Sequence, residues 1–217
     1  MLMKNIAFII NPMSGTQNKR RLPKLINELL DKRQWLENIV FTEREGHALT
    51  LAKQYAAMGF DAVVAVGGDG TVREVAESLV GTHSALGIIP MGLTNTLARH
   101  LSLPLRFNAA LTWLNRCEPV LCDSMEVTLD NSRRLTAMTA VTIGDKQLVN
   151  CAQSVKTSIQ DGQLELHDNS GWRQADDCTA CAHNGTVTID GDEFDAEQNV
   201  TVRVLPDSVY VLVQKRF

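Results

Sequence analysis

The chain has 217 residues, of which 44% are hydrophobic and 21% charged, and its formal net charge is −4. This length fits one large domain or two small ones, and the negative balance excludes the broad basic field of a nucleic-acid-binding protein. The longest apolar runs are far too short for a transmembrane segment, and the first residues carry no cleavable signal pattern. Five scattered cysteines fit reduced thiols better than disulfide bonds. We therefore expect a globular protein of the cytoplasm.

Short apolar runs alternate with amphipathic segments through the first half of the chain. The alternation predicts a mainly parallel sheet covered by helices on both faces. Ligands in such sheets bind beyond the carboxyl ends of the strands. The expected strands are 6–10, 39–42, 62–66 and 85–89, the expected helices are 22–30, 48–58 and 72–80, and the loops at the carboxyl ends are 11–15, 42–47, 67–71 and 90–95.

A glycine-rich loop, Gly67-Gly68-Asp69-Gly70-Thr71, joins the third expected strand to the third expected helix. Its three glycines allow positive φ and a close approach of the backbone to a ligand. Thr71 and Glu74 match a capping box, which fixes the start of the helix at this loop.

A helix that begins directly behind a glycine loop presents free N–H groups and positive dipole charge to an anion. The loop therefore predicts a nucleotide-phosphate site. An acid inside such a site, here Asp69, is expected to act through a cation, or to bond a ribose or an amide.

The pattern of apolar and polar residues changes after Pro119. The runs 125–129, 186–189 and 200–204 alternate apolar and polar residues with period two, and 209–213 is a further β-type run. Turn signals such as Asp130-Asn131 and Asn184-Gly185 separate them. We expect a nucleotide-binding α/β domain over residues 1–120 and an antiparallel β domain over residues 121–217.

The glycine loop fits two known groups, the NAD kinases and the diacylglycerol-kinase-like lipid kinases, and the next loop separates them. The segment from Pro90 to Arg99, with its proline, glycine, threonine and asparagine before a short helix, resembles the lipid kinases and disfavours an NAD kinase. Further segments resemble the same family, namely Asn11-Pro12 with Ser14-Gly15, Thr42 with 45–48, Asp123, 161–164, 189–192 and 202–206.

The resemblance implies an N-terminal three-layer domain of the type shared by NAD kinases and diacylglycerol kinases, with a parallel sheet, followed by an antiparallel β domain. It implies phosphorylation of a lipid hydroxyl, such as that of diacylglycerol, with ATP and Mg²⁺. Phosphoryl transfer of this kind depends on positioning and charge neutralisation more than on covalent chemistry. The implied residues are Asp69, Asp190 and Asp192 for catalysis, Asn11, Thr42, Gly67, Gly68, Gly70, Thr71, Thr94, Asn95 and Arg99 for the nucleotide, and Asp123 and Asp161 for metal.

From pattern alone, Asp190-Gly191 is equally well explained as a type I′ hairpin turn, and Asp161-Gly162 as a plain turn. Lys19-Arg20-Arg21 is either a solvated helix start or a contact for anionic headgroups. The implied partner is a lipid at the inner membrane surface, to which the protein would attach peripherally and without a transmembrane segment.

Two departures from the family pattern define an alternative. The second domain is shorter than in typical members, and Leu93 stands where the family usually has threonine or serine, with Thr94 beside it. The alternative is a degenerate member that binds nucleotide without lipid kinase activity, as a sensor or a partner subunit. Strand edges left by the shortening would favour a homodimer.

Overall fold

The computed structural model describes residues 3–15, 19–130, 132–143, 146–150, 164–168, 171–175, 177–181, 185–196 and 199–214. Its contacts divide the chain into two compact units, Met1–Val120 with Val209–Phe217, and Leu121–Ser208. From the sequence pattern, residues 209–217 are expected in the second domain. They belong to the first unit because this part of the last strand pairs in parallel with a strand of that unit, at Val211 and Leu86.

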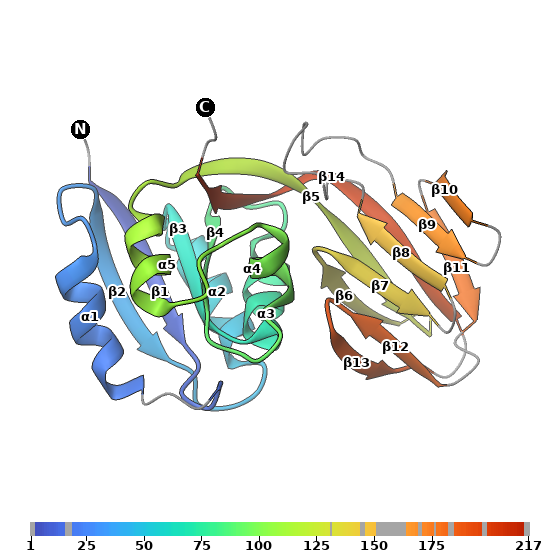
Figure 1. Cartoon of the computed structure of the whole chain (residues 1–217), viewed down its shortest axis with the longest axis horizontal. Helices are drawn as coiled ribbons and strands as arrows, with labels where there is room; N and C mark the ends of the chain where they lie inside the picture. Colours follow the sequence, from blue (N-terminus) through green and yellow to red (C-terminus); the bar gives the residue numbers. More distant parts are fainter. Residues whose placement is uncertain are drawn as a thin grey trace. The chain divides into compact units, whose positions relative to one another are not determined.

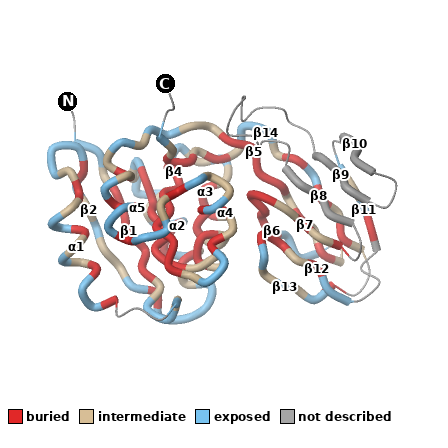
Figure 2. Tube along the Cα trace, viewed as in Figure 1, coloured by how far each residue is buried: buried red, intermediate tan, exposed pale blue. Residues whose placement is uncertain are grey.

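The first unit is built on a parallel sheet (Figure 1). Its strands lie in the order β2-β1-β3-β4, followed by the end of β14. Both central strands, β3 and β4, are buried throughout (Figure 2), which explains why they read as continuous apolar runs without alternation. The bounds are β1 (Lys4–Ile10), β2 (Trp35–Phe41), β3 (Ala62–Gly67) and β4 (Ala85–Pro90).

Helices cover both faces of this sheet, so the predicted three-layer α/β arrangement is confirmed. On one face, apolar residues of α1 and α5 share a buried core with Phe8, Val64 and Ile89 of the strands. On the other face, α2 and α3 pack against each other and against the strands. The helical segments are η1 (Lys19–Arg21), α1 (Leu22–Leu29), α2 (His47–Ala57), α3 (Asp69–Leu79), α4 (Thr96–His100) and α5 (Phe107–Leu114). Within the described residues, no helix has both the length and the apolar character needed to cross a membrane.

Helix α5 is not among the helices expected from the sequence. Its buried residues Phe107, Ala110, Leu111 and Leu114 follow helical spacing, and that pattern could have identified it.

The second unit consists of antiparallel β-structure, as expected. One sheet has the order β10-β9-β8-β7-β12-β13, and in the other β14 lies between β5 and β11, with β6 beside β5. Residues of both sheets, such as Met125, Val141 and Val202, share one buried core. The bounds are β5 (Glu118–Leu129), β6 (Arg133–Ala137), β7 (Ala140–Ile143), β8 (Lys146–Asn150), β9 (Leu164–Asp168), β10 (Gly171–Ala175), β11 (Asp177–Cys181), β12 (Thr186–Ile189), β13 (Asp192–Asp195) and β14 (Asn199–Val213).

The last strand, β14, runs unbroken where the sequence suggested two strands, 200–204 and 209–213. Asp207 has a positive φ of 48°, and its N–H donates to Asp123 Oδ1 of β5 at 2.8 Å. The carboxylate of Asp123 therefore satisfies a backbone group at the distorted point, and the strand continues past a sequence that signals a turn.

Candidate functional site

The loops at the carboxyl edge of the parallel sheet approach one another at positions where only glycine fits. A Cβ on Gly92 would lie 2.6 Å from the Cα of Gly68, and a Cβ on Gly15 would lie 2.3 Å from the carbonyl oxygen of Met91. A Cβ on Gly67 would lie 2.5 Å from Thr71 Oγ1. The loops after β1, β3 and β4 are thus joined by close backbone contact.

Positive φ, which the sequence suggested as a reason for the glycines of the Gly67–Thr71 loop, is not the reason for them. Among the described residues, the glycines with positive φ are Gly15, Gly46, Gly59, Gly81, Gly185 and Gly191. Gly67, Gly68 and Gly70 are not among them, so this loop does not use glycine for left-handed backbone. Gly67 and Gly68 instead let the chain come close to Thr71 and Gly92.

Asp69, the first residue of α3, connects the glycine loop to the loop after β4. Its Oδ1 accepts a hydrogen bond from the N–H of Thr96 at 2.5 Å, and its Oδ2 accepts one from the N–H of Asn95 at 2.9 Å and one from the Thr94 hydroxyl. Thr96 is the first residue of α4. The carboxylate therefore caps a second helix. Of the roles expected for Asp69, this one is hydrogen bonding to amides.

The loop that Asp69 holds is also bonded within itself. Asn95 is buried and has a left-handed backbone with φ of 51°. Its side chain accepts from the N–H of Gly92 at 2.8 Å and donates to the carbonyl of Gly92 at 2.9 Å. Arg99 donates through Nε to the carbonyl of Thr94 at 2.7 Å. These bonds fix the segment from Gly92 to Arg99 in one conformation.

Asn11 links the loop after β1 to the start of α3. Its Nδ2 donates to Thr71 Oγ1 at 3.0 Å, and its Oδ1 accepts from the N–H of Met13 at 2.9 Å. Thr42 is buried directly after β2, where its N–H donates to the carbonyl of Ile10 at 2.9 Å. Several of the predicted nucleotide residues are therefore in contact. Asn11 bonds to Thr71, Thr94 and Asn95 bond to Asp69, and Arg99 bonds to Thr94. Thr42 lies at the same edge of the sheet.

The predicted capping box at Thr71 and Glu74 is wrong. The residue at the N-cap of α3 is Gly68, and no side chain bonds at that cap. Glu74 instead accepts hydrogen bonds from the N–H groups of Gly46, at 3.1 Å, and of Ala48 and Leu49, at 3.1 and 3.4 Å. It thereby caps α2, whose own N-cap residue, Gly46, has no side chain to accept these bonds.

The start of α3 retains the properties of an anion site. The first bond within the helix runs from the N–H of Val72 to the carbonyl of Gly68. The N–H groups of Asp69, Gly70 and Thr71 precede it, so they have no acceptor within the helix. Backbone N–H groups at a helix start favour a phosphate group, because the helix dipole adds positive charge there.

Asp190 lies in the second unit and is buried. Its carboxylate accepts hydrogen bonds from the N–H groups of Met138 and Thr139, each at 2.7 Å, of Ala140 at 3.1 Å, and from the Thr139 hydroxyl at 2.6 Å. Burial raises the pKa of Asp190, and these four hydrogen bonds act in the opposite direction. Such a carboxyl group anchors the 138–140 segment.

The backbone around Asp190 forms a two-residue hairpin turn between β12 and β13, because Ile189 pairs with Asp192. Asp190 and Gly191 both have positive φ, 52° and 97°, as a type I′ turn requires. Asp192 begins β13 and is half-buried. The turn explanation of Asp190-Gly191 is thus the one that the backbone follows.

Among the predicted metal ligands, Asp123 is buried and holds the N–H of Asp207, as described above. Asp161 lies outside the described residues. In the part of the chain that the structure describes, no group of three His, Cys, Asp or Glu side chains could hold a metal ion. The metal role of Asp123 and Asp161 stays a prediction.

Comparison with known proteins gives a family match over the first half of the chain. Residues 5–127 match the diacylglycerol kinase catalytic domain. A diacylglycerol kinase of Staphylococcus saprophyticus is 35% identical over 113 residues, which are 51% of this chain and 37% of that protein. A diacylglycerol kinase of Bacillus subtilis is 34% identical over 104 residues, 47% of this chain and 34% of that protein. The matches thus span about a third of the length of these curated relatives.

The fold likeness extends further than the sequence likeness. A crystal structure of a diacylglycerol kinase from Bacillus anthracis aligns with a TM-score of 0.66 and 16% identity, over 99% of this chain and 98% of that one. A second crystal structure from the same organism aligns with a TM-score of 0.69 and 15% identity, over the same shares of the two chains. At this identity the likeness establishes the fold, and it includes the antiparallel second unit.

Proposed function

Because the chain belongs to the diacylglycerol kinase catalytic domain family, we propose that it transfers a phosphoryl group from ATP, with Mg²⁺, to the hydroxyl of a diacylglycerol-like lipid. The observation that carries the proposal is the linkage of the glycine loop to the loop after β4 through Asp69. This linkage holds the start of α3 and the Gly92–Arg99 segment together, where the phosphates of a nucleotide would bind.

The residues present fit the phosphates of ATP. The free N–H groups at the start of α3 and the Thr71 hydroxyl would hold phosphate oxygens. Asn11, Thr42 and Asn95 would line the nucleotide, and the guanidinium of Arg99 would balance phosphate charge. Asp69 acts as a positioning residue, since its oxygens already accept three hydrogen bonds. The Mg²⁺ that accompanies ATP would supply neutralisation of the phosphate charge.

The acceptor hydroxyl needs a group that accepts its proton. Of the two acids predicted for this role, Asp190 is held in the core by four hydrogen bonds. Asp192 is half-buried at the start of β13. We therefore propose Asp192 as the base and assign Asp190 to the fold. Asp123 and Asp161 stay a proposed pair of ligands for a structural Mg²⁺.

The proposed acceptor is a membrane lipid, so the protein would work at the inner membrane surface as a peripheral protein of the cytoplasm. Dimerisation through strand edges of the second unit is a further proposal. Light scattering at high protein concentration tests it, because a monomer at every concentration would exclude the dimer.

One observation favours a second candidate, a nucleotide-binding protein without lipid kinase activity. Leu93 is 88% exposed on the loop after β4, and the hydroxyl of the neighbouring Thr94 is engaged by Asp69. The hydroxyl expected at position 93 is therefore missing, and the neighbouring Thr94 hydroxyl donates its hydrogen bond to Asp69.

The test is phosphoryl transfer from ATP with Mg²⁺ to diacylglycerol in mixed micelles with anionic lipid. We compare the wild type with Asp69→Asn, which replaces one acceptor oxygen by a donor facing N–H groups. Asp61→Asn is the matched control, because Asp61 accepts the N–H of Asn5 at the opposite end of β3. We expect Asp69→Asn to lower the rate by about 100-fold through misplacement of the loops, and Asp61→Asn to leave it near the wild-type value.

The outcomes separate the candidates. Lipid-dependent transfer that is lost in Asp69→Asn supports the kinase. ATP binding measured by calorimetry, with no transfer to any lipid, supports the nucleotide-binding alternative. Transfer that Asp69→Asn leaves unchanged would show that the site is wrongly placed.

A further inference from the structure

A long segment of the first unit carries no acidic residue. Residues 78–117 contain neither Asp nor Glu, although the chain has 25 acidic residues and a net charge of −4. The same segment contains Arg99, Arg106 and Arg116. It includes α4 and α5, which therefore contribute no acidic side chain of their own, while Asp69 bonds to the start of α4 and Asp31 to Asn115.

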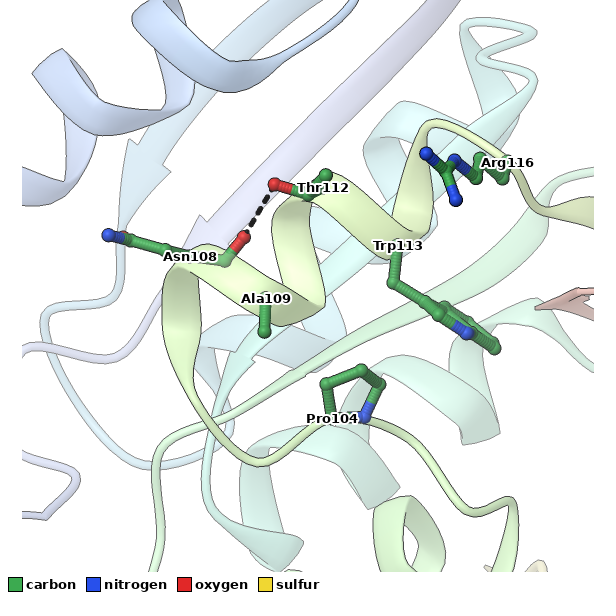
Figure 3. Close-up of a pocket in the computed structure, with 6 residues that line it drawn as sticks. All are labelled: Pro104, Asn108, Ala109, Thr112, Trp113 and Arg116. Atoms are coloured by element: carbon green, nitrogen blue, oxygen red, sulfur yellow. Dashed lines mark hydrogen bonds between the residues drawn. The ribbon is translucent and has the colours of Figure 1, made fainter.

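Within this segment, the outer face of α5 borders an open groove of about 410 Å³ (Figure 3). The side chain of Trp113 and the ring of Pro104 lie on the same side of the helix there. The Thr112 hydroxyl donates to the carbonyl of Asn108 at 2.8 Å, which satisfies it within the helix. The groove is lined by Pro104, Asn108, Ala109, Thr112, Trp113 and Arg116.

The opposite face of α5 is already used by the core, through Phe107, Ala110, Leu111 and Leu114. What remains on the outer face is amphipathic. Trp113 is half-buried, and Leu105, just before the helix, is 41% exposed.

Two arginines frame these apolar groups. Arg106 is the N-cap residue of α5 and follows Leu105, and Arg116 follows the last turn of the helix and lines the groove with Trp113. Both are exposed, and neither forms an ion pair with any residue that the structure describes.

We propose that the outer face of α5 docks the protein onto an anionic phospholipid bilayer. The guanidinium groups of Arg106 and Arg116 pair with lipid phosphates, which planar guanidinium groups bind through two parallel hydrogen bonds. The indole of Trp113 and the side chain of Leu105 enter the headgroup region, where amphipathic aromatic rings are favoured. The inference rests on the proposed function to the extent that a lipid substrate requires the enzyme to reach a bilayer.

The arrangement favours a bilayer over a peptide or a soluble anion. A soluble phosphate would use the arginines but leave Trp113 and Leu105 without a role. An apolar peptide would use the groove but leave Arg106 and Arg116 without a role. Residues 78–117 contribute no carboxylate that an anionic surface would repel.

The test is flotation of the protein with vesicles in the absence of ATP. One set of vesicles contains phosphatidylglycerol and phosphatidylcholine, and the other contains phosphatidylcholine alone. We expect binding to the anionic vesicles only. The variant Arg106→Gln/Arg116→Gln should lower the partition coefficient by about 25-fold, because each arginine near an anionic surface contributes about fivefold.

The matched control is Arg134→Gln/Arg203→Gln, which removes the same charge from two exposed residues of β6 and β14 in the second unit. We expect it to retain most of the binding. Equal losses in the two variants would overturn the proposal, since they would show a response to net charge alone. Binding to neutral vesicles as strong as to anionic ones would also overturn it.

The fluorescence of Trp113 gives a second measurement. Vesicles should shift the tryptophan emission of the wild type to shorter wavelength, and Trp113→Phe should lose this shift. An unchanged shift in Trp113→Phe would contradict the docking face.

Activity on two forms of the substrate separates failure of this proposal from failure of the proposed function. The arginine variant should phosphorylate a short-chain, water-soluble diacylglycerol like the wild type and be slow only on vesicles. Vesicle binding without any kinase activity would overturn the proposed function and leave the docking face supported. Kinase activity with equal vesicle binding in all variants would overturn the docking face and leave the proposed function supported.

Discussion

Acidic side chains perform similar hydrogen bonding in the two units but in different surroundings. In the first unit, Asp69 and Glu74 are half-buried at the edge of the sheet, and each accepts N–H groups from a neighbouring loop. In the second unit, Asp123 and Asp190 are 2% and 6% exposed, and each anchors a backbone segment inside the fold. The edge carboxylates thus connect loops at one end of the parallel sheet, whereas the buried ones hold backbone groups within the second unit.

The two units also differ in how far the likeness to known proteins supports a function. The family match ends at residue 127, near the end of β5, so it covers most of the first unit. The fold likeness covers both units at 15–16% identity. The functional argument therefore depends on the loops of the first unit, while the second unit is supported at the level of its fold.

The largest effect is expected from Asp190→Asn in the second unit. The amide nitrogen would face the N–H groups of Met138 and Thr139, so at least one buried donor would lose its acceptor. We expect the free energy of unfolding to fall by about 2–4 kcal/mol. Urea unfolding measures the effect, and Asp195→Asn on the exposed side of β13 is the control, with a change below about 0.5 kcal/mol. A stable variant that has lost catalysis would instead identify Asp190 as the base.

The next effect is expected at the contact between two loops of the first unit. In Gly92→Ala, the new Cβ would lie 2.6 Å from the Cα of Gly68, which is backbone and cannot turn away. We expect a loss of stability of about 2 kcal/mol, as for other overpacked sites, together with a loss of phosphoryl transfer. Gly68→Ala is the matched control, because its Cβ would lie 3.3 Å from the Cα of Gly92. The midpoint temperature of thermal unfolding should fall further in Gly92→Ala than in Gly68→Ala, and equal decreases would refute the contact.

A smaller effect is expected from Glu74→Gln. The side chain now accepts the N–H groups of Gly46, Ala48 and Leu49 at the start of α2, and the amide would lose one acceptor oxygen. The free energy of unfolding should fall by about 1 kcal/mol, the usual value of a helix cap. Glu28→Gln is the control, since Glu28 forms only an exposed pair with Lys24 at 3.7 Å. Hydrogen exchange should quicken at 46–49 in Glu74→Gln alone, and unchanged exchange there would contradict the cap.

Much of the first unit could be predicted because its strands are short, buried and separated by amphipathic helices. The observed β3 and α3 begin and end within a few residues of the expected segments. The position of the glycine loop at the carboxyl edge followed from that alternation. The partner of each side chain did not follow, because Asp69 bonds to residues 94–96 and Glu74 to residues 46–49, which are distant in sequence. A pattern of neighbouring residues such as Thr71 and Glu74 cannot reveal an acceptor that serves another helix.

In the second unit, local signals gave the strand type but not its continuity. Pro206-Asp207 signals a turn, yet β14 continues because Asp123 bonds the N–H of Asp207 from another strand. The positive φ of Asp190 and Gly191 was open from sequence, since the same residues suit a turn and a catalytic site. Four hydrogen bonds hold Asp190 in the turn, and their donors come from residues about fifty positions earlier. The catalytic role of Asp190 stays a prediction.

The smallest effect concerns Cys122, a buried thiol of β5 in the second unit. Burial raises the pKa of Cys122 to about 12, with further contributions from Asp123 and Asp207. Because the unfolded thiol ionises near its ordinary pKa of 9.0 while the folded thiol stays protonated, stability falls as pH rises above 9. Between pH 8 and pH 9.5 this residue should account for a loss below about 1 kcal/mol. Cys122→Ala should therefore show a shallower decline of the free energy of unfolding over that range, whatever its baseline, and Cys178→Ala, at a half-buried residue of β11, serves as the comparison variant. Identical slopes in the wild type and Cys122→Ala would show that the thiol ionises as readily in the folded protein, and hence that burial does not suppress its ionisation.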